Sequence, residues 1–263
     1  MHLVDTHTHL YLPEFDPDRD EVISRAIELG VDKFFLPNID RSSIDAMLNL
    51  ADLYPGNCYP MMGLHPTSVK ANYRSELEAV QEHLEHRNYY AIGEVGIDLY
   101  WDKTFENEQI ISFQEQVNIS LKKRLPLVIH SRDSIDLIIS ILKECNNSEI
   151  RGVFHSFTGN IEQAEEAVAL GFVLGIGGIV TFKNSNLDEV VKQVDLAHII
   201  LETDSPYLAP VPNRGKRNES SNLIHIAEKI ARVHQTDLNQ VAEITTRNAL
   251  KLFGIDDNFG STA

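Results

Sequence analysis

Histidine and acidic residues recur at the ends of short apolar runs in this chain of 263 residues. His7 and His9 stand two positions apart, so on an extended strand both side chains point to the same side and can converge on one cation. Imidazole and carboxylate groups suit divalent ions, and the absence of cysteine ligands favours a hydrolytic site over a closed structural zinc site. We predict metal ligands at His7, His9, Glu94, His130, His155 and Asp204, with His65 beside them.

The number of these residues predicts more than one ion. Seven candidates exceed the needs of one four-coordinate ion, which favours two ions that share a bridging carboxylate. Two ions about 3.5–4 Å apart can hold both the attacking and the leaving oxygen of a phosphoryl displacement. Glu94 and Asp204 are the carboxylates able to bridge or to take a proton, and we predict that Asp204 orients or deprotonates the activated water. Magnesium, manganese and zinc all remain open.

Basic residues follow two of the predicted strands and indicate phosphate binding. Arg132 follows one strand, and Arg214 lies in the cationic run from Asn213 to Asn218. Loops after the last strands of a barrel often bind phosphate, and the arginine fork matches phosphate oxygens. The alternatives are a solvated charge run and, for Arg132, a pairing with Asp133. Asp98 either orients a metal-binding histidine or caps the segment after it.

Such a site needs a scaffold that brings several strand ends together. Apolar runs alternate with segments of helical period along the chain. Strands are predicted at Leu3 to His9, Lys33 to Asn38, Cys58 to His65, Tyr89 to Gly96, Pro126 to Ser131, Arg151 to Phe157, Gly171 to Gly177 and Ile199 to Asp204. Helices are predicted at Glu21 to Leu29, Ser42 to Leu53, Ser75 to Glu85, Glu106 to Lys123, Ser134 to Glu144, Ile161 to Leu170, Leu187 to Val194, Leu223 to Val233 and Leu238 to Leu252.

Eight strand and helix units within about 250 residues predict an α/β fold, a (β/α)₈ TIM barrel of the metal-dependent hydrolase type. In such a barrel all these strand ends lie on one face. A doubly wound open sheet is the alternative, but its glycine-rich nucleotide-binding turn after the first strand is missing. No linker or low-complexity tract divides the chain, so we predict one domain over residues 1–263.

Composition limits the function. The net charge of −16 disfavours a protein that wraps duplex nucleic acid with a broad basic face. Cys58 and Cys145 are isolated and are interpreted as reduced packing residues. The N-terminus lacks the pattern of a secretory signal, and no apolar run approaches the roughly 18 residues that span a membrane. We therefore expect a cytoplasmic protein without a membrane partner.

Six motifs together resemble the TatD family of metal-dependent deoxyribonucleases, within the amidohydrolase-like barrel group. The resemblance extends from Asp5 to Phe253. Its motifs are D-T-H-T-H-L at 5–10, G-L-H-P at 63–66, G-E-V-G-I-D at 93–98, L-P-L-V-I-H-S-R-D at 125–133, H-S-F-T-G at 155–159 and E-T-D-S-P-Y-L-A-P at 202–210.

The resemblance implies a ligand set and an activity. It implies His7, His9, Glu94 and Asp204 around one ion and Glu94, His130 and His155 around the other, with His65 near the substrate phosphate or behind a ligand. It also implies phosphodiester hydrolysis, in some members as a 3′ to 5′ exonuclease that prefers single strands. The family often has a proline after R-G-K-x-N and an acidic or amide residue, where this chain has Ser220.

Three functions follow, of which the first is favoured. It is a deoxyribonuclease that binds the strand ends of DNA with two divalent metal ions, while Asp204 takes a proton and Arg214 or His65 steadies the developing charge. The second is a hydrolase of a small amide, lactone or phosphoester on the same metal site. The third is a metal-binding protein without catalysis, which the open donor set disfavours. No obligatory protein partner is inferred.

Overall fold

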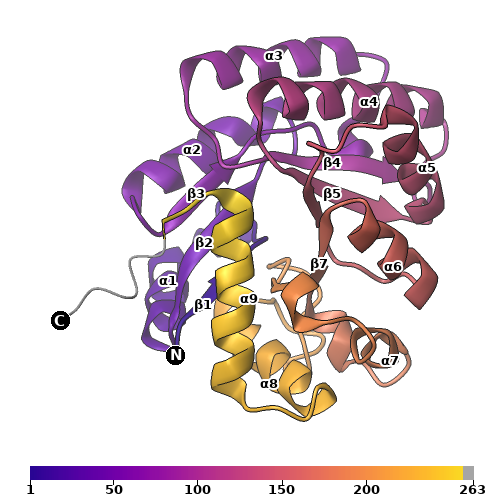
Figure 1. Cartoon of the computed structure of the whole chain (residues 1–263). Coiled ribbons are helices and arrows are strands. Elements are labelled where there is room, and N and C mark those ends of the chain that lie inside the picture. Colours follow the sequence, from indigo (N-terminus) through magenta and orange to yellow (C-terminus); the bar gives the residue numbers. More distant parts are fainter. Residues whose placement is uncertain (257–263) are drawn as a thin grey trace.

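Parallel strands surrounded by helices make up the computed structural model, which describes residues 1–256 (Figure 1). The strands are β1 (Leu3–Asp5), β2 (Val31–Pro37), β3 (Cys58–Met61), β4 (Ile92–Asp98), β5 (Leu127–Arg132), β6 (Gly152–Phe154), β7 (Phe172–Ile176) and β8 (Ile199–Leu201). The helices are α1 (Arg19–Glu28), α2 (Ile44–Leu53), α3 (Tyr73–His86), α4 (Glu106–Lys123), α5 (Ile135–Cys145), α6 (Ile161–Ala169), α7 (Leu187–Val191), α8 (Leu223–Val233) and α9 (Leu238–Phe253).

The strands pair in sequence order. Two parallel sheets, β1-β2-β3 and β4-β5-β6-β7-β8, meet at two seams. At one seam Met62 bridges Ile92, and at the other Thr8 bridges Ser205. Single bridges rather than strand ladders thus join the sheets, in an arrangement that fits the predicted (β/α)₈ barrel.

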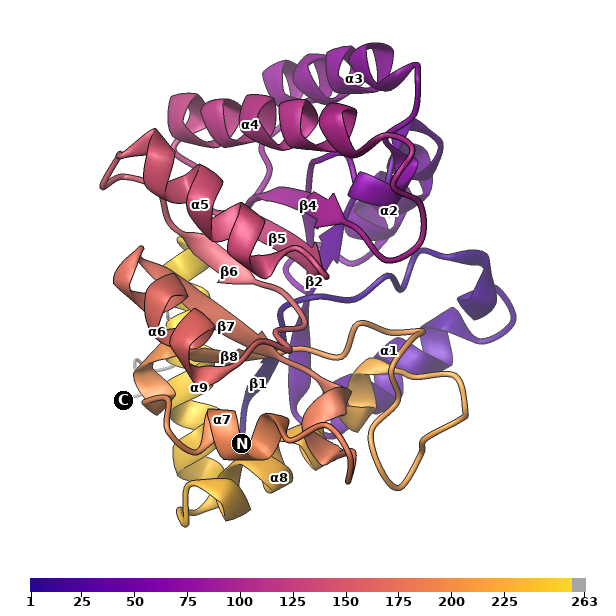
Figure 2. The same cartoon turned by 90° about the vertical axis from the view of Figure 1, so that its right-hand side faces the viewer.

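An apolar layer fills the space inside the strands and meets α9. This inner cluster contains Val4, Phe35, Tyr59, Met61, Val128, Val153, Ile200 and the α9 residues Ala249, Leu250, Leu252 and Phe253. The ring of Phe253 stacks on that of Phe35 with a centroid distance of 4.1 Å. Figure 2 shows α9 on the side opposite the carboxyl ends of the strands. Helix α9 therefore closes one end of the barrel, and the functional face is the other.

A second apolar layer lies between the strands and the outer helices. Buried side chains of α5, such as Ile138 and Leu142, belong to this cluster, as their helical spacing predicts. Local sequence fixes the helix ends: the Asn160 side chain accepts the Gln163 backbone N–H at the start of α6, and Gly254 takes a left-handed conformation after α9. The helices form a rigid shell around the strand ends.

The strands before the predicted site are shorter than the sequence indicates. Strand β1 ends at Asp5 rather than His9, β3 at Met61 rather than His65, and β8 at Leu201 rather than Asp204. For β1 and β8 the reason is a change of partner, because the chain after β1 bonds to the end of β8 through Thr6 N to Leu201 O and to the loop after it through His9 N to Ser205 O. The helices lie within a few residues of their predicted bounds.

Two smaller expectations have mixed outcomes. Both cysteines are free, but only Cys58 is buried; Cys145 is exposed at the end of α5 and is not the packing residue that was predicted. Within residues 1–256, none of the helices combines the length and the apolar character needed to cross a membrane.

Candidate metal centre

The candidate site lies directly above the apolar layer inside the barrel. His130 follows the inner-layer residue Val128 by two positions, and His155 follows Val153 in the same way. Because side chains two apart on a strand share a side, both imidazoles continue the inward-facing rows toward the open end. Glu202 continues the row of β8 by the same rule. The alternation of side chains along the strands thus places the polar donors next to the inner apolar layer.

Glu94 is the centre of the site, buried with its side chain 3% exposed. Its two oxygens approach histidines that lie on or after several different strands. Oε2 lies 3.0 Å from His7 Nε2 and 3.7 Å from His9 Nε2, whereas Oε1 lies 2.9 Å from His130 Nδ1, 3.2 Å from His65 Nε2 and 3.8 Å from His155 Nε2. One carboxylate therefore contacts all five histidines that the sequence predicted.

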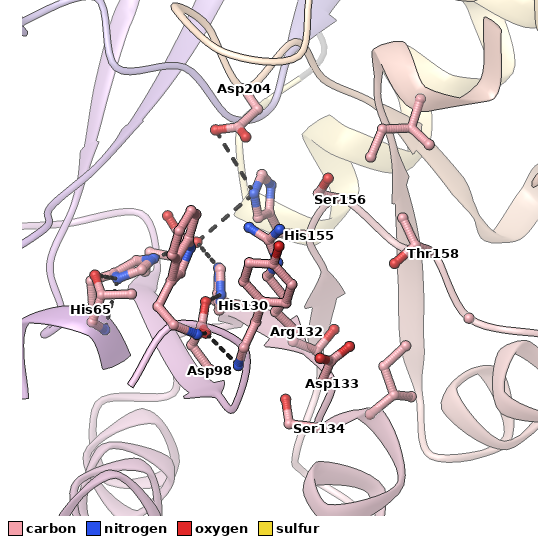
Figure 3. Close-up of a pocket in the computed structure, with 18 of the residues that line it drawn as sticks. His65, Asp98, His130, Arg132, Asp133, Ser134, His155, Ser156, Thr158 and Asp204 are labelled. Carbon is pink, nitrogen blue, oxygen red and sulfur yellow. Dashed lines mark hydrogen bonds and ion pairs between the residues drawn. The ribbon is translucent and has the colours of Figure 1, made fainter. Parts of the chain in front are cut away.

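Asp204 approaches three of these histidines from the loop after β8, and Figure 3 shows it facing His155. Its Oδ1 lies 3.7 Å from His9 Nε2 and 3.9 Å from both His7 Nε2 and His155 Nε2. The backbone N–H of Asp204 donates to His7 O, which fixes the loop after β8 to that after β1. Because β1 ends at Asp5, this cross-seam bonding brings the first-strand pair of histidines into the site, rather than the continuous strand that was predicted.

The donor atoms form three groups, each compact enough to hold a cation. The groups, within which the donor atoms lie within 4.8 Å of one another, are His7-His155-Asp204, His7-His9-Glu94 and His65-Glu94-His130. Glu94 belongs to two of them and His7 to two. His65 thus stands among the donors themselves, whereas the family resemblance implied a place near the substrate phosphate or behind a ligand.

The electrostatics of the site fit bound cations. Burial raises the pKa of Asp204 well above its ordinary value, and the nearby charges of Glu94 and Glu202 raise it further. Burial also acts to raise the pKa of Glu94, but the imidazoles of His65, His7 and His155 outweigh it and hold that pKa well below the usual range. Opposed buried carboxylates of this kind repel one another until a cation lies between them.

Unused donor capacity at His7 supports the same interpretation. His7 is fully buried, and its Nδ1 has no hydrogen-bond partner among the described residues. Its ring stacks on that of His155 with centroids 3.4 Å apart. Burial lowers the pKa of both rings, that of His155 to about 4, so both are neutral at pH 7 and able to ligate. The nitrogen and oxygen donors present therefore fit divalent cations.

Two further carboxylates lie beside the imidazoles of His130 and His155. Asp98 Oδ2 lies 2.9 Å from His130 Nε2, and Glu202 Oε1 lies 2.9 Å from His155 Nδ1. The carboxylates of Asp98 and Glu94 raise the pKa of His130 to about 9, against the opposing effect of burial. Asp98 also accepts the backbone N–H groups of Tyr100 and Trp101, so it contacts both the histidine and the segment that follows it.

The two predicted substrate arginines lie in different places. Arg132 lines the large cavity in front of the donors, which has a volume of about 1340 Å³, and its guanidinium carbon lies 3.9 Å from the centre of the Tyr100 ring. Arg214 is not among the residues that line this cavity; its guanidinium carbon lies 4.3 Å from the centre of the Phe182 ring. The structure therefore brings Arg132, and not Arg214, to the predicted site.

The basic loop of residues 213–219 is attached to α1. Arg217 donates two hydrogen bonds to Asp18, at 2.8 and 2.6 Å, and Glu219 accepts two from Arg25, at 2.8 and 2.7 Å. Ser220, which replaces the family proline, is buried and begins a short 3₁₀ turn. Ion pairs thus hold this loop where the family sequence often has a proline.

Sequence reasoning assigned no role to Glu202, Tyr100 or Trp101. Glu202 stands two positions before Asp204, and the same spacing rule that singled out His7 and His9 would have found it. The two aromatic residues left no comparable pattern, because their exposure becomes apparent only in the folded chain. Glu202 joins the site through His155, whereas the aromatic pair lines the cavity.

Comparisons with known proteins identify the family of this chain. The model of the TatD-related DNase family matches residues 4–254. The uncharacterized metal-dependent hydrolase YabD of Bacillus subtilis (strain 168) is 37% identical over 255 residues, which cover 97% of this chain and 100% of YabD. The uncharacterized metal-dependent hydrolase YcfH of Escherichia coli (strain K12) is 33% identical over 262 residues, 97% of each chain.

Solved structures show the same fold. The crystal structure of YjjV, a TatD homologue from Escherichia coli K12, matches with a TM-score of 0.91 and 29% identity over 97% of this chain and 98% of that one. A TatD-family hydrolase from Entamoeba histolytica matches with a TM-score of 0.82 over 96% and 98% of the chains, at 21% identity, and supports the fold alone.

Barrel and donor set together define a metal-dependent hydrolase. The chain belongs to the TatD-related DNase family. The sequence-based predictions of the fold class and of the family are both confirmed.

Proposed function

We propose that this protein is a deoxyribonuclease that hydrolyses phosphodiester bonds at the ends of single-stranded DNA, in the 3′ to 5′ direction, with two divalent cations. The observation that carries the proposal is the convergence of five histidines on Glu94, opposite Asp204, in one open cavity. Arg132 on the wall of that cavity supplies a positive charge for a phosphate. Membership of the TatD-related DNase family supports the same substrate class.

The chain offers two ligand sets with a shared member. His7, His9, Glu94 and Asp204 would hold one cation, and Glu94, His130 and His155 the other, while His65 lies close enough to Glu94 to join the second set. Magnesium, manganese and zinc all accept these donors. When bound, two divalent cations stabilise the charge on a scissile phosphate and make water a stronger nucleophile.

Protein side chains supply the proton transfer and the positioning. Burial raises the pKa of Asp204, as it does those of Glu202 and Asp5, but of these three only Asp204 lines the cavity, with 16% of its side chain exposed. Asp204 is therefore placed to accept a proton there. Asp98 and Glu202 hold the rings of His130 and His155 in place. Arg132 and His65 meet the charge that develops on phosphate oxygens.

Overall charge favours a strand end as substrate. With a net charge of −16 the surface repels long duplex DNA, whereas a single strand end can enter the cavity, where Arg132 and the bound divalent cations would supply positive charge. Both cysteines are free, which supports our proposal that the enzyme works in the reducing cytoplasm.

Cleavage of an end-labelled single-stranded oligonucleotide tests the proposal. Metal-stripped protein should be inactive, and added Mg²⁺, Mn²⁺ or Zn²⁺ should restore stepwise shortening that a Glu94→Ala variant lacks. A label on either end reports the direction of cleavage. An unchanged oligonucleotide under all three metals, together with hydrolysis of small esters or cyclic amides, would overturn the nuclease proposal and establish a small-molecule hydrolase.

A further inference from the structure

Exposed apolar side chains collect around the cavity of the candidate metal centre. Most large apolar side chains of the described residues are buried, yet four exposed ones line this cavity: Tyr100, Trp101, Tyr207 and Leu208. Trp101 is the most exposed of them, at 69%. An apolar cluster on the rim of a functional cavity is typical of a surface that binds a ligand.

Arg132 lies against the two aromatic residues of this cluster. Its guanidinium carbon is 3.9 Å from the centre of the Tyr100 ring and 5.2 Å from that of Trp101, and the two rings stand at 89° to each other. Within residues 1–256 the side chain of Arg132 forms no ion pair with a carboxylate, so its N–H groups are available to an anion. The guanidinium of Arg132 and the rings of Tyr100 and Trp101 thus lie side by side at the cavity.

The same carboxylate holds this aromatic loop and a metal-site histidine. Asp98 Oδ1 accepts the backbone N–H groups of Tyr100 and Trp101 at 3.0 and 3.2 Å, and its Oδ2 lies 2.9 Å from His130 Nε2. Arg132 follows His130 by two positions on β5, about 7 Å along the strand. The aromatic residues therefore have a fixed position relative to the donors.

From this geometry we infer that Trp101, together with Tyr100 and Arg132, forms a base-stacking subsite for single-stranded nucleic acid. A base stacks on the exposed indole, while the guanidinium, held on Tyr100, binds a phosphate of the same strand. Every base has a π-face, so the subsite is tolerant of sequence, and it selects unpaired strands because bases in a duplex already stack on one another. This inference rests on the proposed function and names the part of the substrate that the cavity wall binds.

Tryptophan fluorescence measures binding at this subsite directly, because Trp101 is the single tryptophan of the chain. The probe is a ten-nucleotide thymidine strand with phosphorothioate linkages, which resist hydrolysis, added to metal-loaded protein. An abasic strand of the same length and charge is the matched control. We expect the thymidine strand to quench tryptophan fluorescence and the abasic strand to leave it nearly unchanged; equal quenching by both strands would overturn the inference.

Variants at Trp101 separate stacking from general apolar contact. In fluorescence anisotropy with a labelled thymidine strand, Trp101→Leu should weaken binding about tenfold or more, and Trp101→Phe should retain most of it. Leu53→Ala, at a 73% exposed position on α2, is the control and should bind as the unaltered protein does. If Trp101→Leu binds like the unaltered protein, the subsite is wrong.

The two proposals fail in different ways. Cleavage of oligonucleotides by the unaltered protein, combined with normal binding by Trp101→Leu, would overturn the subsite and keep the nuclease. Absence of both binding and cleavage of single strands by the unaltered protein would overturn the nuclease and the subsite with it.

Discussion

Two arginine-bearing regions border the functional face, and they use their charge differently. Arg132 at the end of β5 packs on Tyr100, and Arg214 and Arg217 in the loop of residues 213–219 pack on Phe182 and Phe15. Only Arg132 lines the cavity. In the other region Arg217 is bound to Asp18 of the chain leading into α1.

The difference shows that a basic residue after a barrel strand is not by itself a phosphate site. Two ion pairs attach the loop of residues 213–219 to α1 and to the residue before it. They join Arg217 to Asp18 and Glu219 to Arg25. Arg132 has an aromatic support and no ion pair among the described residues. Arg214 likewise lies on an aromatic ring and forms no ion pair among the described residues, so its place outside the cavity is what separates it from Arg132.

Removing the carboxylate of Asp98 should have the largest effect, because Asp98 joins the Arg132 region to the metal centre. We expect Asp98→Asn to weaken metal binding about 10- to 100-fold, since His130 loses the carboxylate that faces its Nε2 and keeps only Glu94. Calorimetric metal titration of the metal-free protein measures this. Asp102→Asn alters an exposed carboxylate of the same loop and is the control. Equal metal affinity in both variants would contradict the role of Asp98.

Truncation of single arginines tests the comparison directly. Arg132→Ala should raise the KM for a single-stranded oligonucleotide about tenfold or more, because a charged hydrogen bond to phosphate is lost. Arg214→Ala should change the KM less than about twofold, because its side chain lies outside the cavity. Steady-state kinetics with the same labelled strand measures both. Equal increases would place the loop of residues 213–219 in the substrate site.

Most of the fold could be predicted from the sequence, because the spacing of apolar residues and the length of each segment indicate the helices and strands. Helix α4 matches its predicted bounds of Glu106 and Lys123, and α8 matches Leu223 and Val233. The ends of β1 and β8 could not be predicted, because they depend on bonding between residues almost 200 positions apart, such as Thr8 and Ser205. Long-range pairing of this kind leaves no trace in local spacing.

The convergence of the candidate metal ligands could be predicted from the sequence, whereas the position of the arginines could not. Histidine and carboxylate types at strand ends are rare enough to identify a site before its geometry is known, and five histidines do meet at Glu94. Arginines are common on surfaces, so only the fold separates Arg132 from Arg214. The stacking of Arg132 on Tyr100 depends on the loop conformation that Asp98 imposes.

The smallest expected effect concerns the attachment of the loop of residues 213–219. The hydrogen bonds from Arg25 hold the pKa of Glu219 below its ordinary value of 4.5. A depressed folded-state pKa stabilises the protein above the unfolded-state value, and this stabilisation is lost as the pH falls through the folded-state value. We therefore expect Glu219→Gln to cost about 1 kcal/mol in urea denaturation at pH 7 and less as the pH is lowered toward 4.

An exposed pair of the same chemistry provides the contrast. Glu243 pairs with Arg247 on α9, where both side chains are mostly exposed, so Glu243→Gln should leave the free energy of unfolding unchanged within error. If the two variants behave alike, the Arg25–Glu219 pair is an ordinary surface pair and another contact fixes the loop. If only Glu219→Gln is destabilised, with no change in KM, the Arg25–Glu219 pair serves the attachment of the loop and not substrate binding.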